Sequence, residues 1–152
     1  MKHTLVFTKR SRFPCSAEQL FAWHEAPEAF SRLMPHGEPV HVLHHDGRIT
    51  NGARAVLRVG YWPFRLRWEL MHENYQHGRQ FCDVQTRGPF RYYRHEHVFL
   101  PIDENNCELM DRITFVMPLG IVGYTLGRWL IMAKFRRLFD FRHRVTRQAF
   151  AS

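Results

Sequence analysis

The sequence of 152 residues has no long uninterrupted apolar run. Its most apolar stretch, 113–132, is broken by Pro118 and three glycines and contains Arg128, whereas a membrane-spanning helix needs about 20 apolar residues in succession. We therefore interpret this stretch as a strand followed by the start of a helix. The segment 1–10 also lacks the apolar centre of a signal peptide, which predicts a cytoplasmic protein.

Cysteine is scarce. Cys15, Cys82 and Cys107 lie far apart, without a CxxC spacing. An odd number of cysteines does not close a disulfide framework, and their separation is not that of a zinc site. We expect three reduced thiols.

The sequence also lacks the glycine-rich and serine motifs that mark common enzyme sites. No P-loop, GxGxxG fingerprint or GxSxG elbow is present, and we find no internal repeat, low-complexity segment or linker. These absences argue against a nucleotide-dependent enzyme and an α/β-hydrolase. A chain of this length, with 45% hydrophobic residues, predicts one domain over residues 1–152 without a cofactor.

Acidic residues are few relative to basic ones, and the net charge is +8. Basic proteins attract nucleic acids and anionic membranes. The arginines are spread over the whole chain, so we do not expect a nucleic-acid partner. An anionic membrane surface remains a possible partner for basic residues on the outer side of the C-terminal segment: Lys134, Arg136, Arg137, Arg144 and Arg147.

The apolar residues that are present follow two different periods. In 120–150, Ile131, Phe135, Leu138 and Phe139 recur at steps of three and four, which predicts one long amphipathic helix. We expect Trp129 to anchor the packing of this helix against the rest of the fold. Between 39 and 117 the period is two, which predicts a succession of strands.

The N-terminal part adds one strand and two short helices. Residues 3–13 alternate between apolar and polar side chains, which indicates a strand. Ser16 and Gln19 have capping-box spacing and predict a helix over 17–24, and Pro27 precedes a second short helix over 28–33. This order predicts an α+β fold in which a curved antiparallel sheet wraps around one long C-terminal helix.

Several segments also resemble a known family. They are the segment 81–90, the His-Glu-His of 95–97, Asp111, and the Pro-Leu-Gly of 118–120. Together they resemble bacterial members of the START-like (SRPBCC) superfamily, which includes polyketide cyclases/dehydrases and coenzyme-Q-binding proteins. The resemblance implies a helix-grip fold with a cavity for a small molecule between sheet and helix.

The predicted hairpins bring polar residues together on the inner face of the sheet. A tight turn at His77-Gly78 pairs His72 with Asp83, and a turn at Gly88-Pro89 pairs Asp83 with His95. The following loop brings His97 near Asp111. Polar groups on a buried face need partners or a ligand. The predicted ligand-binding residues are His72, Asp83, Gln85, Tyr93, His95, His97, Asp111, Trp68, Phe99 and Phe135.

Several interpretations of this inner face remain open. The leading one is binding of a hydrophobic or amphipathic molecule such as a lipid, quinone or polyketide. The alternative is a cofactor-independent cyclase or dehydratase, with His95 or His97 as general base and Asp111 or Asp83 orienting it. A two-histidine, one-carboxylate metal set rests on a weak HxH motif, so no metal is expected. The histidines and carboxylates can also pair purely structurally.

Overall fold

Seven strands form one antiparallel sheet in the computed structural model, which describes residues 3–151. The spatial order is β1-β7-β6-β5-β4-β3-β2, so each strand from β2 to β7 lies beside its neighbour in sequence and β1 joins the far edge at β7. The strands are β1 (Thr4–Phe13), β2 (Val40–His45), β3 (Arg54–Val59), β4 (Leu66–Gln76), β5 (Gln80–Arg87), β6 (Tyr92–Pro101) and β7 (Cys107–Val116).

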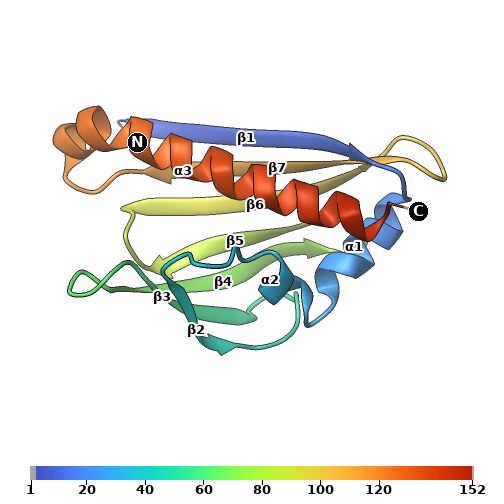
Figure 1. The fold of residues 1–152 in the computed structure, drawn as a ribbon, viewed down its shortest axis with the longest axis horizontal. Helices are drawn as coiled ribbons and strands as arrows, with labels where there is room; N and C mark the ends of the chain where they lie inside the picture. The colour runs from blue at the N-terminus through green and yellow to red at the C-terminus, as the bar shows by residue number, and fades with distance from the viewer. Residues whose placement is uncertain (1–2, 152) are drawn as a thin grey trace.

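Three helices accompany this sheet in the described chain: α1 (Ala17–Glu25), α2 (Ala29–Arg32) and α3 (Gly120–Ala149). The predicted capping box starts α1, because the Ser16 hydroxyl accepts from the Gln19 amide and the Gln19 side chain accepts from the Ser16 amide. Figure 1 shows α3 lying along the sheet near β1, β7 and β6, with α1 near the C-terminal end of α3 and α2 next to α1. The predicted helix-grip architecture is confirmed.

The predicted strand registers are also confirmed. His72 pairs with Asp83, Asp83 with His95, and His97 with both Phe81 and Asp111. Side chains alternate across a strand, so these pairings place every second residue of four neighbouring strands on one face. That face turns toward α3.

The core consists of two apolar clusters on this inner face. One lies near α1 and contains Leu20, Phe21 and Phe99 among other residues. The other contains Phe115 of β7 and Phe139 of α3. Between the clusters lies a group of buried and half-buried histidines and aspartates: His97 stacks on Phe81 of the first cluster, and His95 packs edge to face against Phe139 of the second. The polar group is therefore held in place by aromatic packing on both sides.

The apolar stretch 113–132 divides between the end of β7 and the start of α3, as predicted. No helix within the described residues is long and apolar enough to cross a membrane. The prediction that Trp129 packs within the fold is wrong, because 71% of its surface is exposed. The first turns of α3 project past the end of the sheet (Figure 1), and Trp129 belongs to the N-terminal third of this helix.

Candidate functional site

The polar group on the inner face is organised around two aspartates, and Asp83 on β5 is the first. Its Oδ1 lies 2.7 Å from Nδ1 of His72 on β4. Its Oδ2 lies 3.1 Å from Nε2 of His97 and 3.7 Å from Nδ1 of His95, both on β6. One carboxylate thus contacts three histidines from its two neighbouring strands.

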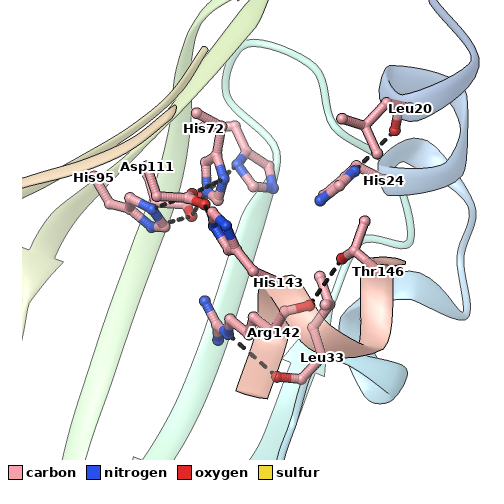
Figure 2. A network of polar contacts seen from close by, with 11 residues as sticks. Leu20, His24, Leu33, His72, His95, Asp111, Arg142, His143 and Thr146 are labelled. Atoms are coloured by element: carbon pink, nitrogen blue, oxygen red, sulfur yellow. Dashed lines mark hydrogen bonds and ion pairs between the residues drawn. The ribbon is translucent and has the colours of Figure 1, made fainter. Parts of the chain in front are cut away.

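Asp111 on β7 is the second centre, and it also contacts three histidines. Its Oδ1 lies 2.8 Å from Nε2 of His95 and 2.8 Å from Nδ1 of His97. Its Oδ2 lies 2.6 Å from Nε2 of His143, which reaches in from α3 (Figure 2). His95 and His97 therefore bridge the two aspartates. We call these six residues the His/Asp network.

Two of the short contacts are poorly aligned for hydrogen bonding. Nδ1 of His72 and Nδ1 of His97 lie within 2.8 Å of a carboxylate oxygen, yet neither forms a well-aligned hydrogen bond with a described residue. Nδ1 of His143 is also buried without a described partner. Direction matters to a hydrogen bond more than to an ion pair. We therefore regard the contacts of His72 and of His97 Nδ1 as electrostatic.

The two bridging histidines differ in charge. Burial alone would lower the pKa of His97, but the charges and hydrogen bonds of Asp111 and Asp83 outweigh burial and raise its pKa to about 9. Burial, followed by the neighbouring charge of His97, lowers the pKa of His95 to about 4. At neutral pH His97 is thus an imidazolium and His95 a neutral imidazole.

The two aspartates remain ionised. Burial would raise the pKa of each, but the close contacts of His72 and His97 hold the pKa of Asp83 well below its usual range. Burial acts in the same direction on Asp111, but the charge of His97 and the hydrogen bonds from His143 and His95 hold the pKa of Asp111 well below its usual range. The negative charges of the two aspartates therefore face the imidazolium of His97.

Little free space adjoins the network. A hollow of about 10 Å³ lies beside it, lined by residues that include His97, Asp111 and Arg142. This volume holds about one water molecule. A larger open depression of about 450 Å³ lies elsewhere on the surface, near Arg12 and Arg147, and none of the predicted site residues lines it. This hollow is therefore too small for an organic ligand in this conformation.

Three of the predicted ligand-binding residues lie in an aromatic group next to the network. Tyr93 and Trp68 pack edge to face, with ring centroids 5.0 Å apart, and Phe135 of α3 contacts Tyr93. Tyr93 and Phe135 are buried, whereas Trp68 is half-buried. Burial, followed by the nearby charge of Asp83, raises the pKa of Tyr93, so its hydroxyl stays protonated.

Two other predicted residues are engaged elsewhere. The Gln85 side chain donates to the Phe90 carbonyl oxygen and accepts from the Phe90 amide, so it holds the turn between β5 and β6. Phe99 lies in the cluster near α1, against Phe21 and His24. Both therefore have roles in packing or turn geometry in this structure.

Sequence reasoning missed two histidines at this site. His143 lies four residues after Phe139 on the inner stripe of α3, and that spacing was the available signal. His24 of α1 borders the hollow, and its Nδ1 donates to the Leu20 carbonyl oxygen 2.8 Å away (Figure 2). Because that partner is an acceptor, Nδ1 of His24 carries the proton.

Comparison with known protein families identifies the family of this chain. The family described as polyketide cyclase / dehydrase and lipid transport matches residues 13–142. The chain belongs to this family. No curated protein matches its sequence.

Several solved structures share the fold of this family member at low sequence identity. A Streptomyces aromatase/cyclase, ZhuI, is 14% identical with a TM-score of 0.74, over 97% of this chain and 93% of that one. TTHA0849 from Thermus thermophilus is 16% identical with a TM-score of 0.71, over 97% and 100%. A START superfamily protein from Mycobacterium smegmatis is 13% identical with a TM-score of 0.68, over 95% and 96%. These likenesses support the helix-grip fold.

Proposed function

We propose that this family member binds a hydrophobic or amphipathic molecule, such as a lipid, quinone or polyketide, between the sheet and α3. The observation that carries the proposal is a gradient of burial along the inner face of β4. His72 is buried, Leu70 and Trp68 are half-buried, and Leu66 is 51% exposed. The apolar inner face is thus closed at the His/Asp network and opens toward the start of β4.

The half-open region has the chemistry of a binding site for an apolar molecule. Apolar and aromatic side chains from the sheet and α3 surround it, and burying them against a ligand is worth about 25 cal/mol per Å². The Trp68 indole N–H is buried and has no described partner, so it is available to a ligand oxygen. The half-buried residues are Leu5, Trp68, Leu70, Phe90, Ile131, Met132 and Leu138.

Uptake of a fluorescent fatty acid such as cis-parinaric acid tests this proposal. Met132→Arg places a charge in the half-open region and should weaken probe binding at least tenfold. The matched control is Val6→Arg, on the outer face of β1, where Val6 is already exposed. Equal binding by both variants, or no uptake by the unmodified protein, contradicts the proposal. Native mass spectrometry of the purified protein checks for a retained ligand.

The enzyme alternative finds less support in the geometry. A general base must be unprotonated and within reach of its substrate. His97 is protonated at neutral pH, and His95, although neutral, is 1% exposed and enclosed by Asp111 and Phe139. Turnover by these residues requires that the network first open.

We also propose an anionic membrane as partner of the open end. The β3–β4 loop and the start of α3 lie at the same end of the long axis of the molecule (Figure 1). Their large apolar side chains are exposed, for example 80% for Trp62, 83% for Phe64 and 78% for Leu126. We call this set the apolar end: Tyr61, Trp62, Phe64, Leu66, Leu119, Ile121, Val122, Leu126, Trp129 and Leu130.

The charges around the apolar end favour an anionic membrane over other partners. Neither 47–68 nor 112–139 contains an acidic residue, whereas Arg65, Arg67 and Arg128 lie within or beside the exposed apolar residues. Exposed tryptophans beside cationic residues are typical of proteins that bind at the membrane interface. Each basic residue near an anionic surface contributes about 1 kcal/mol. Docking there would bring the half-open region next to its source of ligand.

Vesicle sedimentation with phosphatidylcholine alone or with added phosphatidylglycerol tests the docking. We expect binding only to the anionic vesicles, loss of most binding in Trp62→Ser/Phe64→Ser, and weakening by salt. Ile102→Ser is the control, because Ile102 is an exposed apolar residue of the β6–β7 loop at the opposite end. Equal binding by both variants contradicts the proposal. A dimer in solution that the double variant dissociates would assign the apolar end to a second copy of the chain.

A further inference from the structure

Three side chains of the His/Asp network converge on one point. One ligand atom from each of Asp83, His95 and His97 lies within 4.8 Å of those of the other two. Oδ2 of Asp83 is 3.1 Å from Nε2 of His97 and 3.7 Å from Nδ1 of His95. Two donors bound at about 2.1 Å to one tetrahedral ion are about 3.4 Å apart. The two distances from Asp83 are therefore close to those between ligands in a coordination shell.

The sheet itself produces this convergence. His95 and His97 are two residues apart on β6 and so point to the same face. Asp83 is the register partner of His95 on β5, and cross-strand partners lie side by side. The three donors thus come from the rigid centre of the sheet, which positions ligands better than loops do.

The remaining polar atoms of these three residues are held by other side chains. Oδ1 of Asp111 contacts the ring nitrogens that face away from the convergence point, Nε2 of His95 and Nδ1 of His97, both at 2.8 Å. Nδ1 of His72 contacts the other oxygen of Asp83 at 2.7 Å. Histidines that bind metals almost always donate their other N–H to a carboxylate or carbonyl. Asp111 supplies that carboxylate to Nε2 of His95 through a hydrogen bond and holds Nδ1 of His97 by an electrostatic contact.

We propose that Asp83, His95 and His97 bind one divalent transition-metal ion, with Asp111 and His72 orienting the three ligands. Two imidazoles and one carboxylate suit ions such as Zn²⁺, Fe²⁺ or Mn²⁺, and they leave coordination positions open for water or another ligand. The Asp83 side chain is 18% exposed, so an ion reaches the site from its side. On binding, the ion replaces the proton between His97 Nε2 and Asp83.

A bound ion also balances the negative charges of the two carboxylates at the site. Asp111 is a buried carboxylate and Asp83 a half-buried one, and the contacts of His72 and of His97 Nδ1 are not well aligned as hydrogen bonds. A buried cation compensates two carboxylates more fully than misaligned contacts do. This inference is separate from hydrophobic binding, because the half-open region beside Trp68 and Met132 contributes none of the three ligands.

The experiment titrates the EDTA-treated, dialysed full chain with Co²⁺, whose absorption spectrum reports ligand geometry, and with Zn²⁺ by calorimetry. We expect one equivalent of each ion. Asp83→Asn and His95→Gln should weaken binding at least a hundredfold, and Asp111→Asn, which removes only an orienting group, about ten- to a hundredfold. His44→Gln is the matched control, because His44 also pairs with an aspartate, Asp46, but on the surface.

The outcomes separate the site from adventitious binding. One equivalent that survives His44→Gln and is lost in Asp83→Asn supports the site. No stoichiometric binding by the unmodified protein overturns it, whether or not the variants fold. Binding to several equivalents, or equal binding by Asp83→Asn and His44→Gln, assigns the ions to surface histidines and also overturns it. Fatty-acid uptake measured in EDTA reports on the hydrophobic site independently, so either proposal can fail alone.

Discussion

Nε2 of His143 on α3 lies 2.6 Å from Oδ2 of Asp111 on β7, and both side chains are buried. The contact joins the C-terminal helix to the centre of the sheet through a charged group. Lys9 of β1 and Asp140 of α3 form a second ion pair between sheet and helix, 2.5 Å apart, but at the surface. The two pairs permit a direct comparison of buried and exposed charge.

Asp111→Ala should therefore destabilise the protein far more than Asp140→Ala. Removing the buried carboxylate leaves Nε2 of His95 and Nε2 of His143 without their acceptor and takes one of two carboxylates from His97. We expect a cost of about 3 kcal/mol, which lowers Tm by roughly 10 °C. The exposed pair contributes at most about 1 kcal/mol. Thermal unfolding of the two variants measures both. Similar Tm values would show that the network does not stabilise the fold.

The residues of this network could be placed from the sequence because hairpin turns fix strand register. His77-Gly78 and the turn near Gly88 determined which residues of β4, β5 and β6 are neighbours, and alternation determined their face. His143 was not placed, because nothing in the strand pattern fixes how far α3 slides along the sheet. Side-chain packing, which closes the space around the network, has no signature in the period of the sequence.

The exposure of Trp129 has a different physical reason. Helical periodicity shows which residues share a face but not where the covered surface ends. A helix of 30 residues is about 45 Å long, whereas a strand of ten residues spans about 33 Å. One end of α3 must therefore extend past β1 and β7. The helical period of the sequence carries no sign of this difference in length.

Two glycines near the start of α3 should respond oppositely to alanine. A Cβ at Gly123 would lie 1.8 Å from the Pro118 carbonyl oxygen, which is backbone, whereas at Gly127 it would lie 2.6 Å from the flexible Cε of Met117. Alanine favours a helix over glycine by about 1 kcal/mol. Gly127→Ala should thus be neutral or slightly stabilising, and Gly123→Ala destabilising. Thermal unfolding measures both, and a Tm ordering opposite to this would contradict the packing at Pro118.

The free energy of unfolding should also depend on pH, because folding shifts the pKa values of the buried histidines in opposite directions. The pKa of His97 is raised from 6.5 to about 9, so its contribution is complete below pH 6.5 and is lost as pH rises through 9. Burial lowers the pKa of His24 and His95 to about 4, so each destabilises the fold as pH falls from 6.5 toward 4. The free energy of unfolding should therefore be highest near pH 6.5.

The alkaline arm of this profile is the sharper measurement. A shift from 6.5 to about 9 corresponds to about 3 kcal/mol between pH 6.5 and 9, with Asp83 and Asp111 as its source. Urea unfolding across that range should show the decline in the unmodified protein and in His44→Gln. In His97→Gln the decline should flatten, whatever the variant's stability at pH 6.5, because the titrating group is gone. An equal slope in His97→Gln would mean that His97 is neutral in the folded protein and that the network holds its charge elsewhere.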